Sequence, residues 1–205
     1  EENEFSRNWR SVAGKIPSPK AILCISAHWL TKGTYVTAMQ NPRTIHDFGG
    51  FPKELFDLEY PAPGNPELAK DISRNATKTT IELDHEWGLD HGAWSVIQQM
   101  YPEANIPVLQ LSIDYHKNAE YHFELAKELG QLRKKGVLVL GSGNMVHNLR
   151  MMSLPRGAAN MTEAQNVSFG FDWALEMNDK FKKLIRDGNF SDLKNYSKLG
   201  KAANL

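Results

Sequence analysis

Apolar residues along this chain form either continuous runs or repeats at helical spacing. The runs at 21–27 and 137–140 contain almost no polar side chains, which is typical of strands buried on both faces of a sheet. Shorter apolar stretches predict further strands at 35–39, 79–83 and 107–113. The run at 137–140 is the most purely apolar of these, and we expect it to be a buried strand.

Helices are predicted where apolar residues recur every three or four positions. The clearest stripe lies in 119–132, where it consists of Ala119, Phe123, Ala126, Leu129 and Leu132. Similar patterns predict helices at 5–12, 67–76, 92–100 and 171–185. Because strands and helices alternate, the predicted fold class is α/β. We expect a central, mostly parallel or mixed sheet flanked by helices, in a single catalytic domain spanning residues 1–205.

Two segments lack this periodicity. Residues 41–66 contain five prolines and three glycines, which predicts a long irregular loop. Loops of that length inside a compact domain usually have a function. Residues 151–168 are mostly small and polar, so we expect a flexible surface segment there.

Composition excludes several classes of protein. The 205 residues include 24 basic and 24 acidic side chains, so the formal net charge is zero, and we expect neither a nucleic-acid nor a membrane partner. No apolar stretch approaches the ~20 residues that cross a bilayer. Cys24 is the single cysteine and cannot form an intramolecular disulfide, which favours a cytoplasmic location. The oligomeric state is left open.

Two histidines come after the two most apolar runs. His28 comes after 21–27, and His147 comes a few residues after 137–140. Parallel sheets place ligand sites just outside the carboxyl ends of their strands. We therefore expect both side chains to converge on one metal or one substrate; the alternative is a pair of hydrogen-bonded histidines in ordinary loops.

The other histidines are weaker candidates. His91 lies at the predicted start of a helix, whose N-terminus favours an anionic ligand, and His46 lies in the irregular loop. Each is interpreted as an acid, a base or a substrate contact, with a structural role as the alternative. The remaining three, His85, His116 and His122, are expected to be solvated.

Five short motifs occur in the order found in a known family. They are Ser26-Ala27-His28-Trp29, residues 44–52 (TIHDFGGFP), residues 60–64 (YPAPG), Asp90-His91-Gly92 and residues 143–149 (GNMVHNL). With these motifs the chain resembles the class III extradiol ring-cleavage dioxygenases, in the 4,5-DOPA dioxygenase branch. The match extends over nearly the whole chain.

The resemblance implies a function and a set of site residues. It implies a non-haem metal, with Fe(II) expected for activity and Zn(II) possible, that acts on a small aromatic diol and dioxygen to open the ring. His28 is then a metal ligand, and His147 is either a second ligand or the catalytic acid and base. His91 matches a histidine that contacts substrate in relatives, and we expect it to assist catalysis.

The family also has histidine ligands in segments outside the matched motifs. One lies in a Gly-His-Gly-Ser-Pro stretch before the first motif, and the other lies in a later Pro-x-His-Tyr-like segment. We expect residues 1–205 to lack these segments at both ends. With His28 and His147 alone, the chain is expected to bind a divalent metal weakly, since stable sites use about three protein ligands.

The substrate-binding residues follow from the same motifs. We expect His46, Trp29 and Phe48 to contact the substrate. An aromatic wall for its ring is expected from Trp29, Phe48 and Phe51. Two other functions stay open at this point: a zinc-dependent hydrolase and a metal-free ligand-binding module. Metal identity and oxygen uptake distinguish them from a dioxygenase.

Overall fold

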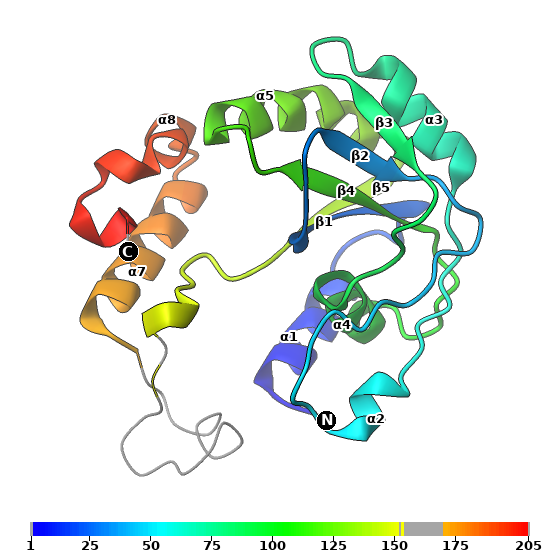
Figure 1. Ribbon diagram of the computed structural model, residues 1–205, viewed down its shortest axis with the longest axis horizontal. Helices are drawn as coiled ribbons and strands as arrows, with labels where there is room; N and C mark the ends of the chain where they lie inside the picture. Colours follow the sequence, from blue (N-terminus) through cyan, green and yellow to red (C-terminus); the bar gives the residue numbers. More distant parts are fainter. Residues whose placement is uncertain (1, 152, 154–169, 205) are drawn as a thin grey trace. The chain divides into compact units, whose positions relative to one another are not determined.

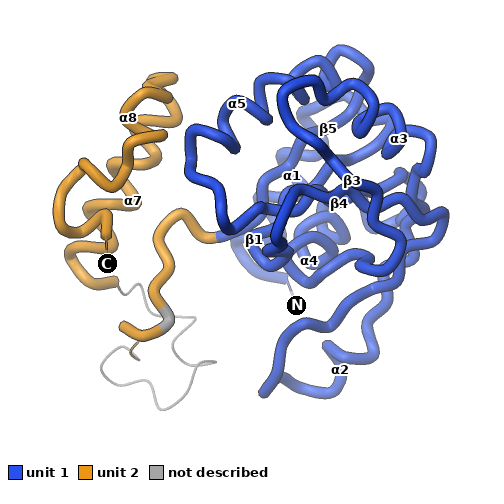
Figure 2. The backbone as a smooth tube through the Cα atoms, turned by 45° about the horizontal axis from the view of Figure 1, so that its top comes forward, with its two compact units in different colours: residues 1–143 blue, residues 144–205 orange. Residues whose placement is uncertain are grey.

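The computed structural model describes residues 2–151, 153 and 170–204, so most of the expected flexible segment at 151–168 lies outside the described residues. The chain divides into two compact units, residues 1–143 and 144–205 (Figure 2). The assignment of residues 1–205 to one catalytic domain stays a prediction.

The first unit is built on a five-stranded sheet. Its strands are β1 (Ala21–Thr31), β2 (Thr34–Thr37), β3 (Ile81–Asp84), β4 (Val108–Asp114) and β5 (Val137–Ser142). They lie in the order β3-β2-β4-β1-β5. Strand β1 pairs in parallel with β4 and β5, whereas β2 pairs antiparallel with β4, so the sheet is mixed.

Helices cover both faces of this sheet (Figure 1). They are α1 (Glu4–Ala13), α2 (Lys53–Phe56), α3 (Pro66–Asn75), α4 (His91–Met100) and α5 (Ala119–Leu129), and the 3₁₀ helix η1 (Gly130–Lys135) extends α5. Helices α3 and α5 lie on one face, and α1 and α4 lie on the other. The predicted α/β class with a helix-flanked mixed sheet is confirmed.

Alternate residues of β1 enter two separate cores. Leu23 packs with Leu109 of β4 and with α3 and α5, whereas Ile22 and Cys24 pack with Val108 and α4. All of these side chains are 0% exposed, which explains why 21–27 shows no polar alternation. Burial also raises the pKa of the Cys24 thiol, with a smaller contribution from the Asp90 charge, so this thiol is an inert core group.

The prediction that 137–140 is a buried strand is wrong. Strand β5 is the edge of the sheet, and its burial alternates, with Val137 6% and Val139 37% exposed. An apolar run does not distinguish a central strand from an edge strand, because both present at least one apolar face.

The second unit is helical in its described part. It contains η2 (Leu149–Met151), α7 (Asp172–Arg186), α8 (Phe190–Lys194), η3 (Tyr196–Lys198) and η4 (Lys201–Asn204). Met177 of α7 is 1% exposed, and Phe181 packs edge-on against Tyr196. The helix expected at 171–185 is therefore confirmed. Among the described residues, no helix is both long enough and apolar enough to cross a membrane.

A buried polar pair joins α4 to the centre of the sheet. Asp90 caps α4 by accepting a hydrogen bond from the Ala93 amide, and its other oxygen accepts one from Gln110 Nε2 at 2.8 Å. The side-chain oxygen Oε1 of Gln110 accepts a hydrogen bond in turn from the backbone amide of Asp90 at 2.7 Å. Both side chains are 0% exposed, so each depends on the other for the hydrogen bonds that it would otherwise make with water.

Replacing Gln110 should therefore destabilise the first unit strongly. We expect Gln110→Leu to lower the free energy of unfolding by about 2–4 kcal/mol, because it leaves Oδ2 of the buried Asp90 carboxylate and the Asp90 amide without their partner. Chemical denaturation followed by circular dichroism measures this. The matched control is Gln131→Leu at an exposed position, and equal midpoints for the two variants would show that the pair contributes no stability.

Candidate active site

His28 lies at an irregularity inside β1 and not beyond its end. The pairing of β1 with β4 shifts register between Ile25 and Leu30, and the consecutive residues Ala27 and His28 are both exposed. The Ser26 hydroxyl accepts a hydrogen bond from the His28 amide at 3.2 Å. A bulge of this kind redirects a side chain, and here it turns the His28 imidazole out of the sheet.

The start of α4 brings His91 against His28. His91 lies at the start of α4, as the sequence predicted, and Asp90 is the N-cap. A Cβ atom on Gly92 would lie 2.4 Å from Ser26 Oγ and 2.9 Å from His28 Cδ2. The helix therefore approaches β1 this closely only because residue 92 has no side chain.

The irregular loop supplies a third side chain. Its first part pairs with the segment before α4, since the Ile45 amide donates to the Leu89 carbonyl and the Leu89 amide donates to the Arg43 carbonyl. This pairing places Asp47 beside His91. Asp47 Oδ1 accepts hydrogen bonds from both the backbone amide and the ring Nδ1 of His91, each at 2.9 Å.

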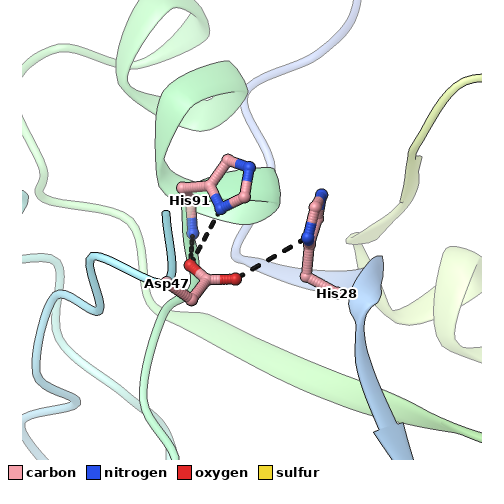
Figure 3. A group of neighbouring side chains, drawn as sticks. All are labelled: His28, Asp47 and His91. Carbon is pink, nitrogen blue, oxygen red and sulfur yellow. Dashed lines mark hydrogen bonds and ion pairs between the residues drawn. The ribbon is translucent and has the colours of Figure 1, made fainter. Parts of the chain in front are cut away.

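His28, Asp47 and His91 form one group of ligand-type atoms (Figure 3). Asp47 Oδ2 lies 3.7 Å from His28 Nδ1, and the two imidazole centroids are 4.0 Å apart. One donor atom from each residue lies within 4.8 Å of the others. The side chains are 44%, 20% and 29% exposed in chain order, so the group opens to solvent on one side.

The electrostatics of the group centre on Asp47. Partial burial raises the pKa of its carboxyl, but the backbone and side-chain hydrogen bonds from His91, together with the His91 charge, lower it by more. The net pKa therefore lies below its usual range, and Asp47 is an ionised acceptor. Two imidazoles and one carboxylate suit Fe(II) and Zn(II) by donor type, so these residues fit the metal implied by the resemblance.

An aromatic wall borders the group. The Phe48 ring meets His91 edge-on, with centroids 5.3 Å apart, and it also contacts Phe51 and Phe56. Trp94 of α4 completes this wall, and its Nε1 donates to the Ile45 carbonyl. Phe51 is 56% and Phe56 is 38% exposed, so part of the wall faces solvent. The structure thus brings together His28, His91 and Phe48.

The other two substrate-binding candidates have partners of their own. His46 Nε2 donates to the Leu58 carbonyl at 2.8 Å while its ring packs on Phe48. Trp29 is 3% exposed and stacks on Trp87, with ring planes 3° apart. Each therefore stabilises its own segment, and a contact with substrate stays a prediction for both.

His147 belongs to the second unit. It is exposed, and it borders a hollow lined by Trp173, Met177, Phe181 and Tyr196. Its expected convergence with His28 stays a prediction.

Two details of the sequence interpretation need correction. His85 and His116 are exposed as expected, but His122 is half-buried, and its Nε2 donates to the Asp114 carbonyl at 3.1 Å. Sequence reasoning also missed Asp47, which no periodicity marks. The available signal was its position next to His46 inside a family motif.

Comparisons with known proteins identify the family of this chain. Residues 2–203 match the family described as the catalytic LigB subunit of aromatic ring-opening dioxygenase. A protein of Escherichia coli K12 named 4,5-DOPA dioxygenase extradiol is 51% identical over 183 residues, which are 89% of this chain and 64% of that protein. A protein of the same name from Mirabilis jalapa is 36% identical over 199 residues, covering 96% of this chain and 70% of the relative.

A solved structure is also similar to this chain. The crystal structure of an uncharacterized protein from Escherichia coli K12 superposes with a TM-score of 0.71 at 39% identity, covering 89% of this chain and 66% of that one. The chain thus spans 64% and 66% of the length of these two Escherichia coli proteins. The resemblance in the five motifs is confirmed, and the chain belongs to the LigB family of aromatic ring-opening dioxygenases.

Proposed function

We propose that this protein is a metal-dependent extradiol dioxygenase that opens the ring of a DOPA-like catechol with dioxygen. The observation that supports this most directly is the pair of imidazoles, His28 and His91, beside the Phe48 aromatic wall. The names of the Escherichia coli and Mirabilis jalapa relatives point to the same substrate class. We further propose Fe(II) as the active metal, Zn(II) as a second possible occupant, and a cytoplasmic location.

His28 is the proposed metal ligand in the described first unit, and His147 is the second ligand candidate. The His28 ring lies at the bulge of β1 and is 44% exposed, with one nitrogen toward Asp47 and the other pointing away from it. A non-haem Fe(II) at this position would supply a Lewis acid with open positions and an electron source for dioxygen.

His91 and the aromatic wall would bind the catechol. The His91 ring lies 4.0 Å from His28, so a diol oxygen at the metal would lie within reach of its free nitrogen. Phe48 would pack on the ring of the substrate, with His46 and Trp29 as the remaining proposed contacts. The open side of the group provides the entry route.

His147 is the proposed acid and base. A histidine suits both tasks because its ordinary pKa lies near neutrality. It would take a proton from one catechol hydroxyl and return it when the oxygen–oxygen bond breaks, with His91 assisting. Overall, one ring carbon–carbon bond next to the diol breaks, and both atoms of dioxygen enter the product, giving an aldehyde and a carboxylate.

Metal binding tests the role of His28. Removing a residue that hydrogen-bonds to a metal ligand typically weakens metal binding roughly 10–100-fold. We expect His28→Ala to weaken Zn(II) binding by more than this, because the variant removes a ligand itself. Competition titration with a chelating dye measures the affinity. His116→Ala, another exposed histidine, is the control. Unchanged affinity in His28→Ala would exclude His28 as a ligand.

The acid–base role of His147 is tested by turnover. His147→Ala should lower kcat on DOPA with Fe(II) by ~10²–10⁴-fold, the usual cost of removing a general acid or base. Oxygen uptake and the absorbance of the ring-opened semialdehyde give the rate. His116→Ala should match the parent. Equal rates for the two variants would refute the assignment, and turnover without oxygen uptake would favour the zinc hydrolase.

Phe48 should affect substrate binding more than turnover. We expect Phe48→Ala to raise KM for DOPA roughly tenfold, because an aromatic contact contributes about 0.5–1.5 kcal/mol beyond its buried area. Phe5→Ala is a suitable control, since Phe5 is 66% exposed on α1. An unchanged KM in Phe48→Ala would show that the wall does not contact the substrate.

A further inference from the structure

Asp47 contacts both imidazoles of the site from one side. Its Oδ1 lies 2.9 Å from His91 Nδ1, and its Oδ2 lies 3.7 Å from His28 Nδ1. Figure 3 shows the carboxylate facing the Nδ1 edge of each ring, while the second nitrogen of each ring points away from it. Asp47 is therefore placed to act on the two histidines together.

The hydrogen bond to His91 fixes which ring nitrogen bears the proton. An ionised carboxylate only accepts hydrogen bonds, so Nδ1 of His91 must be the donor. When the ring is neutral, Nε2 then has a free lone pair. The His91 amide donates to the same oxygen at 2.9 Å, so the loop and the start of α4 are joined at that atom.

The geometry at Asp47 disfavours a direct bond to a metal through Oδ1. That oxygen already accepts two hydrogen bonds, and both would have to break or bend to admit an ion. If Asp47 instead bonds to a ligating histidine and not to the metal, no such change is needed, because a ligating histidine commonly directs its second nitrogen at a carboxylate. Oδ2 faces His28 Nδ1 in that way, although 3.7 Å is too long for a direct hydrogen bond.

We propose that Asp47 is a positioning residue that holds His91 as the Nδ1–H tautomer and faces the Nδ1 side of His28, leaving both Nε2 atoms free on the open side. The purpose of this arrangement rests on the proposed function, in which His28 binds the metal and His91 contacts the substrate. The tautomer itself is independent of that function and is testable without metal or substrate.

The first test is the tautomer of His91 in the metal-free full chain. Long-range ¹H–¹⁵N correlation spectra at about pH 8, where a histidine is ordinarily neutral, distinguish Nδ1–H from Nε2–H. We expect Nδ1–H in the parent and in Asp47→Asn, whose amide oxygen still accepts, and a shift towards Nε2–H in Asp47→Ala. The control is Asp57→Asn, because Asp57 is an exposed carboxylate in the same loop that accepts a hydrogen bond from Lys53; this variant should match the parent. An Nε2–H tautomer in the parent would overturn the proposal.

The second test distinguishes positioning from metal ligation. Asp47→Ala should keep the visible Co(II) spectrum of the parent and should lower kcat on DOPA about 10–100-fold with a smaller change in KM, whereas Asp47→Asn, which keeps the acceptor oxygen, should recover most of that loss. A loss of Co(II) affinity in Asp47→Ala as large as that in His28→Ala, or an altered Co(II) spectrum, would make Asp47 a ligand and overturn the proposal. If the parent does not open catechols, the proposed function fails, while the tautomer and Co(II) results still decide the role of Asp47.

Discussion

The position of His91 beside His28 depends on a buried carboxylate–amide pair. Asp90 and Gln110 exchange two hydrogen bonds at 2.7 and 2.8 Å in a region that water does not reach, and this fixes the first turn of α4 on β4. Buried polar groups of this kind are costly unless fully paired, so the pair permits little variation in the helix position. His91 follows Asp90 directly and is located by the same bonds.

Two further constraints complete the site. Gly92 allows α4 to approach within contact distance of Ser26 and His28, and the bulge in β1 turns His28 outward. Asp47 then joins the irregular loop to the helix start through His91. The three side chains are partly exposed, so their mutual attraction is modest, and the buried framework beneath them provides the rigidity of the group.

Much of this fold was predictable from the sequence, because burial imposes periodicity. The strand in 107–113 and the helices at 5–12 and 92–100 were expected within a few residues of their observed bounds. Strand order and the bulge in β1 have no periodic signal, which is why 137–140 was misjudged as a buried strand. Within the site, position and motif indicated His28, His91 and Phe48. Asp47 was missed, because its role arises from a loop contact between residues far apart in sequence.

The central proposal is that this protein inserts both atoms of dioxygen next to the diol of a catechol. The most direct measurement is turnover of DOPA by the Fe(II)-loaded full chain under ¹⁸O₂, with mass spectrometry of the product. We predict one dioxygen consumed for each ring opened, and one ¹⁸O atom retained in the new carboxylate. A product without ¹⁸O, or an intact ring with no oxygen consumed by the metal-loaded protein, would contradict the account.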